Sequence, residues 1–251
     1  MCAQHCTAFG ERLFERALMD NSADAKDALA RLFDAERTVR ARHRDVTALS
    51  QDKLLAAMRA EIAAPAADRA EQALRFTRLA LVLGELEGAE VADLLIDLLG
   101  VDEAEPRAAA GEALQAHAFD RFKEVALAIE RALQRLPKGN LALAELPYVI
   151  SEVPEPGVSK LLGLFLKHAD PEAVAGALEA AVETGDVSLA SSIENLVGDK
   201  RKVQMEDEEG EEGLVTIGEL ATEALDLLDS IDVGEIDEEA PPPPMPKRGR
   251  R

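Results

Sequence analysis

Apolar residues recur at helical spacing along most of this chain, and the helices that they predict come in pairs. The clearest pair lies between Asp170 and Asp199. Asp170 is a residue type that caps helix N-termini, and Pro171 is tolerated in the first turn because its missing N–H would be unpaired there. The first helix has an apolar face formed by Ala173, Val174, Ala177, Leu178 and Ala181. After a break at 184–186, the second helix has an apolar face formed by Val187, Leu189, Ala190, Ile193, Leu196 and Val197.

Similar pairs begin at residues 68, 105, 140 and 170, at intervals of 37, 35 and 30 residues. One such pair cannot bury its apolar face alone, so pairs of this kind stack on their neighbours. The stretches PRAAAGEAL (106–114) and PEAVAGALEA (171–180) resemble HEAT or HEAT-like repeats of bacterial type, and the resemblance covers residues 68–230. It implies an all-α fold, a right-handed α-solenoid of HEAT-like helical pairs with an extra N-terminal helical segment. Pro147 lies inside a first helix, where a kink is expected.

This pattern predicts three regions. Residues 1–65 form an N-terminal helical segment, residues 66–232 form the repeat array, and residues 233–251 form a disordered acidic and Pro-rich tail with a basic tip. Within the array, the predicted units are 68–104, 105–139, 140–169 and 170–199, followed by a capping unit at 200–232 that contains the acidic loop 206–213.

The capping unit differs from the other units because short apolar pieces flank its acidic run. Val203–Met205 and Leu214–Ile217 favour a small hairpin. The alternative is that residues 201–213 are a disordered insertion. Thr216 and Glu219 have the spacing of a capping box for the closing helix, whose apolar positions are Ile217, Leu220, Ala221, Ala224, Leu225, Leu227 and Leu228. A cap of this kind would shield the last apolar face of a solenoid.

The N-terminal region is helical by pattern but does not match the repeat. Helices are predicted at 8–19, 22–45 and 50–64. In the second of these, core spacing is found for Ala25, Ala28, Leu29, Leu32, Phe33 and Val39. Arg37, Arg40 and Arg44 share one face, which would either contact an anion or pair with neighbouring acids, and we favour the second interpretation.

Charge is distributed unevenly along the chain. The net charge is −21, and residues 66–200 hold 12 Lys or Arg against 24 Asp or Glu. An acidic array repels phosphate backbones, so the expected partner is a protein and not nucleic acid, and a basic surface on that protein would suit the array. The absence of a long uncharged apolar run predicts no membrane span. With two cysteines and no secretory signal in the sequence, we expect a cytoplasmic protein without a disulfide framework.

Few residues suggest chemistry. Cys2, His5 and Cys6 offer three soft ligands, but a structural zinc site needs four, so no metal is predicted. His117 and His168 lie where capping of helix C-termini is the ordinary role. The acids at 85, 87, 90 and 93 fit a helical surface better than a cation site. No phosphate loop, nucleophile elbow or paired-cysteine motif is present, and we expect neither enzymatic activity nor a cofactor.

These observations predict a cytoplasmic, non-enzymatic scaffold or adaptor that binds a protein partner. The resemblance implies that second helices line the concave side, which gives the candidate contacts Asp93, Asp97, Lys123, Arg131, Lys160, Lys167, Ser188, Ser191 and Asn195. The alternative is a HEAT-like enzyme or enzyme subunit, similar to bilin lyases or nucleic-acid repair enzymes. Those would need an aromatic cleft or a basic groove, and aromatics make up 3% of the chain. A third possibility is that the acidic loop and the basic tail regulate an intramolecular state.

Overall fold

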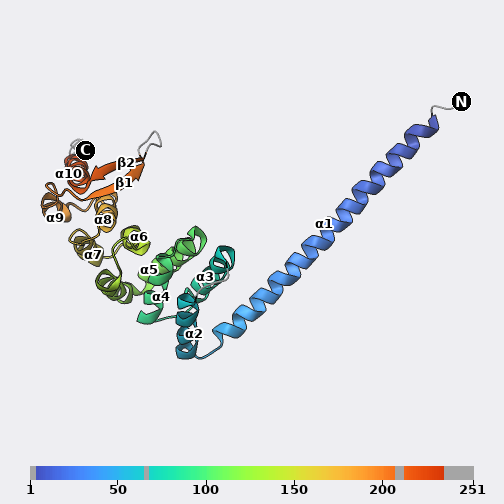
Figure 1. Cartoon of the computed structure of the whole chain (residues 1–251), viewed down its shortest axis with the longest axis horizontal. Coiled ribbons are helices and arrows are strands. Elements are labelled where there is room, and N and C mark those ends of the chain that lie inside the picture. The colour runs from blue at the N-terminus through green and yellow to red at the C-terminus, as the bar shows by residue number, and fades with distance from the viewer. Residues whose placement is uncertain (1–3, 65–67, 207–211, 235–251) are drawn as a thin grey trace, which may run out of the picture. The chain divides into compact units, whose positions relative to one another are not determined.

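The computed structural model describes the backbone of residues 4–64, 68–206 and 212–234, and the side chains of residues 24–64, 68–205 and 213–230 (Figure 1). Within these residues the chain is mostly helical, and its strands form one antiparallel pair, so the predicted all-α class is confirmed at this level. The chain divides into two units, Met1–Ala57 and Met58–Arg251. We describe each of them separately.

The first unit contains a long helix. Helix α1 runs from Gln4 to Thr47 without interruption. Helix α2 (Gln51–Ala63) begins in this unit, and its residues from Met58 onward belong to the second unit. The predicted break between residues 19 and 22 is therefore wrong. Asn21 and Ser22 are weak helix formers, but neither prevents a helix from continuing. The apolar residues for which a core was predicted do lie on a helix, but their side chains are exposed, with Leu32 at 54% and Phe33 at 55%.

The second unit contains the predicted helical pairs. They are α3 (Arg69–Leu83) with α4 (Ala89–Leu99), the two parts of α5 (Ala104–Arg135), α6 (Leu141–Ser151) with α7 (Gly157–Phe165), and α8 (Pro171–Glu183) with the 3₁₀ turn η1 (Val187–Leu189) and α9 (Ala190–Glu194). Helix α5 is divided by Arg121, whose φ of −143° and ψ of 51° are not helical. Helix α6 continues through the buried Pro147, and its backbone is helical on both sides of the proline.

Polar caps mark the start of three pairs. The side chain of Asp68 accepts a hydrogen bond from the Glu71 amide (2.7 Å), and the side chain of Asn140 accepts one from the Ala142 amide (3.0 Å). Asp170 accepts one from the Glu172 amide (3.2 Å). Each bond satisfies an amide that the helix itself leaves unpaired. The pattern of Asp and Asn at the predicted unit starts therefore reports real helix boundaries.

Neighbouring pairs are in contact through matching helices. On one side α3 contacts α5, α5 contacts α6, α6 contacts α8, and α8 contacts α10 (Ile217–Gly234). On the other side α4 contacts α5, α5 contacts α7, and α7 contacts η1 (Figure 1). The buried positions between them are mostly Ala, Leu, Val and Ile. These small and branched side chains pack closely without large aromatic rings.

The second helix of the last pair is shorter than predicted. Residues 187–189 form a 3₁₀ turn and α9 ends at Glu194, although the sequence predicted one helix to Val197. Leu189 and Ile193 are buried, whereas Val187 and Val197 are 49% and 47% exposed. Asp186 accounts for part of the difference, because its carboxylate accepts hydrogen bonds from the Ser188 amide and hydroxyl and holds the first turn in a capped conformation.

The capping unit has the predicted hairpin and capping box. Strands β1 (Lys202–Glu206) and β2 (Glu212–Thr216) pair antiparallel, with Val203 opposite Val215. The amide of Thr216 donates to Glu219 Oε2 (2.8 Å), and the Glu219 amide donates to Thr216 Oγ1 (3.2 Å), which is the reciprocal pattern of a capping box. Most of the predicted acidic loop and the predicted tail from residue 235 lie outside the described residues.

A glycine sets the distance between α6 and α8. A Cβ atom at Gly176 would lie 2.7 Å from the Ala144 carbonyl oxygen, whereas one at Gly163 on α7 would meet only Leu189 Cδ2 at 3.7 Å. We expect Gly176→Ala to destabilise the second unit by about 1–3 kcal/mol, because the clash is with backbone. Gly163→Ala should be neutral or stabilising, since alanine favours a helix. Chemical denaturation followed by circular dichroism measures both, and equal effects would contradict the close approach.

Candidate protein-binding surface

Four of the six charged residues among the predicted contacts form ion pairs between neighbouring helices. Arg131 on α5 donates to Asp93 on α4 (Nη2 to Oδ2, 2.8 Å), and Arg135 pairs with Asp97 (Nη1 to Oδ1, 2.6 Å). Lys160 on α7 pairs with Glu130 on α5 (3.3 Å). These pairs match acids with bases across neighbouring helices. Their contribution to partner binding remains a prediction.

The other predicted contacts are exposed or have local roles. Lys123 and Lys167 are exposed, on α5 and just after α7. Ser188 belongs to the turn capped by Asp186. The side-chain Nδ2 of Asn195 donates to the Ser191 carbonyl oxygen (2.7 Å), one helical turn earlier. The nine predicted residues are therefore spread over several helices and do not converge on a single pocket.

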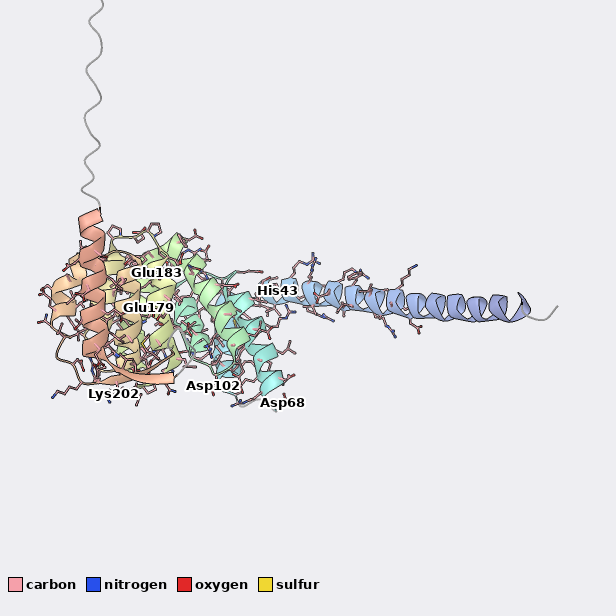
Figure 2. The ribbon with its side chains drawn as sticks, turned by 90° about the horizontal axis from the view of Figure 1, so that it is seen from above. His43, Asp68, Asp102, Glu179, Glu183 and Lys202 are labelled. Carbon is pink, nitrogen blue, oxygen red and sulfur yellow. The ribbon has the colours of Figure 1, made fainter. Side chains whose placement is uncertain are left out.

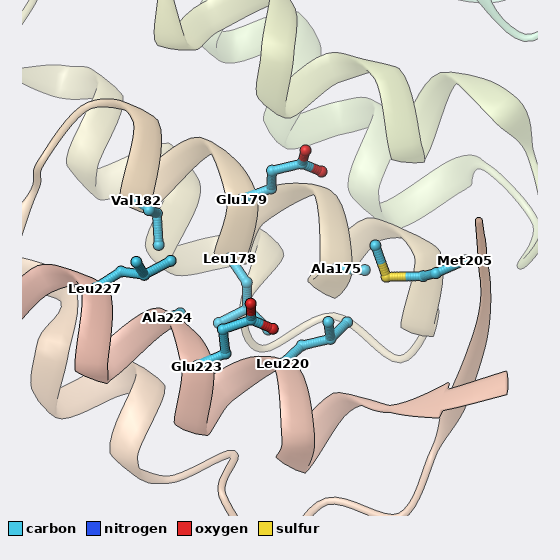
Figure 3. Close-up of a pocket in the computed structure, with 9 residues that line it drawn as sticks. All are labelled: Ala175, Leu178, Glu179, Val182, Met205, Leu220, Glu223, Ala224 and Leu227. Carbon is cyan, nitrogen blue, oxygen red and sulfur yellow. The ribbon is translucent and has the colours of Figure 1, made fainter. Parts of the chain in front are cut away.

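An apolar cleft lies instead among α8, β1 and α10, and the sequence did not predict it. Its volume is about 200 Å³. The residues that line the cleft are Ala175, Leu178, Glu179 and Val182 from α8, Met205 from β1, and Leu220, Glu223, Ala224 and Leu227 from α10 (Figure 3). Glu223 points from α10 toward α8, whereas Glu179 points from α8 toward the next helix on the other side. An apolar floor with carboxylates at its edge suits an apolar side chain that is flanked by cationic ones.

The acidic character of this surface continues onto α6. The Tyr148 hydroxyl on α6 donates to Glu179 Oε2 at 2.5 Å. Burial raises the pKa of the Tyr148 phenol, and the hydrogen bond to Glu179 and the charges of Glu145 and Glu183 raise it further. Tyr148 therefore stays protonated and keeps donating to Glu179. Figure 2 shows Glu179 and Glu183 close together on α8.

The sequence contained a signal for this surface that periodicity did not use. Helices α6, α8 and α10 contain nine Asp or Glu and no Lys or Arg. On an exposed helix, acids are commonly balanced by bases three or four positions away. Three neighbouring helices without such bases leave a negative field that favours a positively charged partner.

Three of the four carboxylates that clustered near Glu87 in the sequence are paired with arginines. Glu87 pairs with Arg121, Glu90 pairs with Arg59, and Asp93 pairs with Arg131. Among the residues whose side chains are described, no group of three His, Cys, Asp or Glu side chains is placed to hold a metal ion. The side chains of Cys2, His5 and Cys6 lie outside the described residues.

The two histidines contact helix ends in the preceding pair. His117 Nε2 lies 3.3 Å from the carbonyl oxygen of Leu83, the last residue of α3. His168 Nε2 lies 3.1 Å from the Leu133 carbonyl in the last turn of α5. The Asp170 amide donates to His168 Nδ1 (3.2 Å), so Nε2 carries the proton and donates to Leu133. The predicted capping role is thus found, although the capped helix belongs to the neighbouring pair.

Within the described part of the chain, no helix is both long and apolar enough to cross a membrane. Comparison of the chain with protein families, with curated proteins and with solved structures gives no match.

Proposed function

We propose that this protein is a non-enzymatic scaffold or adaptor, built as a right-handed α-solenoid of HEAT-like helical pairs, that binds a protein partner. The contacts between successive helices support the architecture. In a solenoid each unit packs on its neighbours and leaves an extended surface for binding. The matching contacts of α3, α5, α6, α8 and α10 have this pattern.

The acidic, apolar cleft between α8 and α10 is the observation that carries the binding proposal. Its apolar lining forms a hollow at the surface in which Leu227 stays half-exposed, so an apolar side chain of a partner can enter it. Glu179 and Glu223 stand at its edge, and the surrounding helices contain no base. The partner is therefore a protein segment with an apolar anchor and Lys or Arg beside it.

A charge reversal in the cleft tests this function. The full chain, immobilised, would capture partners from a lysate of its source cells, which mass spectrometry identifies. We expect the double variant Glu179→Lys, Glu223→Lys to reduce capture of the main partner by about tenfold or more, because lysines at these positions would repel the Lys or Arg side chains of the partner. The matched control, Asp120→Lys with Glu194→Lys, changes the same charge at two exposed positions away from the cleft and should capture the partner normally.

The captured protein is then purified and titrated against all three forms of the chain. Weaker binding to the cleft variant alone, with an affinity that falls as salt is raised, supports the proposal. Equal affinity for the wild type and for both double variants would contradict it.

A further inference from the structure

Helix α1 is 44 residues long, and an apolar stripe is exposed along the part of it whose side chains are described. On its described part, Leu29, Leu32 and Phe33 are each at least 50% exposed, and Val39 is 37% exposed. Large apolar side chains that are exposed along one face of a helix mark a surface that binds another element.

The spacing of the stripe fits a second helix that lies alongside. Ala25, Leu32, Val39 and Val46 follow one another at intervals of seven residues, and Leu29, Glu36 and His43 lie four residues after the first three of them. A polar residue at a single core position is tolerated in coiled coils, where it fixes the register. Seven-residue spacing keeps one face of a helix turned toward a partner helix along its whole length. Repeats of this kind on a helix longer than about 25 residues are typical of coiled coils.

The charges on α1 indicate which partner fits and in which direction. Residues 24–36 contain four acids and two bases, whereas residues 37–45 contain four arginines and one acid. A second copy that runs antiparallel places the arginine-rich part of each helix beside the acidic part of the other. A parallel copy would place arginines beside arginines.

We propose that two copies of this chain associate through antiparallel pairing of their α1 helices, with the stripe around Leu32 and Val39 at the interface. This inference goes beyond the proposed partner binding, which uses a different unit of the chain. The ion pairs that α1 makes internally do not compete strongly with it. Arg37–Asp34 (3.1 Å) and Arg42–Asp45 (3.4 Å) are exposed pairs of the kind that contributes little to stability.

Sedimentation equilibrium of the full chain over a range of concentrations tests the association. We expect the wild type to form a dimer. Leu32→Asp or Val39→Asp should raise the dissociation constant of the dimer by at least about tenfold, because each change removes an apolar contact from the interface. Leu81→Asp is the matched control, since Leu81 on α3 is also exposed and lies in the other unit. It should leave the dimer unchanged. A wild type that stays monomeric, or a control that dissociates as readily as Leu32→Asp, would overturn the proposal.

A charge exchange tests the direction and does not alter the apolar stripe. Asp24 and Arg42 are 18 residues apart, which is five helical turns, so both lie on one flank of the stripe. In an antiparallel pair Asp24 faces the Arg42 region of the other copy. Asp24→Arg should therefore weaken the dimer by about fivefold, and the double variant Asp24→Arg, Arg42→Asp should restore it. If Asp24→Arg has no effect, or if the second change fails to restore the dimer, the antiparallel arrangement is wrong.

Discussion

Ala177→Glu is expected to destabilise the second unit by several kcal/mol, about 3 by the usual cost of placing a charge in a core. Ala177 is fully buried on α8, which contacts α6, α7 and α10. A glutamate there would either leave its carboxylate unpaired or push a neighbouring helix away. Because α8 contacts both the preceding pair and the closing helix, the loss should extend to α10.

Chemical denaturation of the variant beside Ala116→Glu decides this prediction. Ala116 is an exposed helical position on α5, so the same substitution there should change the free energy of unfolding by less than about 0.5 kcal/mol. A similar loss in both variants would mean that the cost comes from the added glutamate itself and not from its burial.

Asp170→Ala is expected to cost about 3 kcal/mol. Asp170 is 2% exposed, and it is the only charged residue that is buried among those whose side chains are described. Its Oδ2 accepts a hydrogen bond from the Gly139 amide at 2.7 Å, and its Oδ1 accepts one from the Glu172 amide. Alanine would remove both hydrogen bonds to a carboxylate, so the loss of the contact with Gly139 adds to the loss of a helix cap.

Two further variants separate these contributions. Asp170→Ser keeps an acceptor for the Glu172 amide but is too short to reach Gly139 as well, so its cost should be intermediate. Asp68→Ala removes an exposed cap with no link to another pair, and about 1 kcal/mol is expected. If Asp170→Ala is no more harmful than Asp68→Ala, the contact with Gly139 contributes nothing to stability. Thermal and chemical denaturation of the full chain measure all three.

Features that depend on neighbouring residues were predicted well from the sequence. The cap at Asp170, the capping box of Thr216 and Glu219, and the hairpin before it involve residues close together in the chain, and the predicted unit starts at 68 and 140 coincide with capped helices. Their hydrogen bonds follow from residue type and spacing alone. The succession of helices in pairs was also predicted, because apolar residues at helical spacing indicate each helix from its own local sequence.

Features that depend on packing between helices were not predicted. Periodicity placed the residues of α1 around Leu32 in a core, yet it cannot say which element covers them. It identified Asp93 and Arg131 as exposed charges but not as partners, since their contact requires α4 and α5 to lie side by side. The cleft between α8 and α10 was missed for the same reason. Its lining comes from three elements, and Met205 lies on a strand outside any helical pattern.

The contacts between helical pairs also bear on how the chain folds as it is synthesised. Arg131 and Asp93 are 38 residues apart, His168 and Leu133 are 35 apart, and Lys160 and Glu130 are 30 apart. Loops of this length close at modest entropic cost, and contacts this local are associated with fast folding. A nascent chain can pack each pair onto the preceding one before the next has left the ribosome. The apolar surface that α8 turns toward α10 is covered only after α10 has been synthesised.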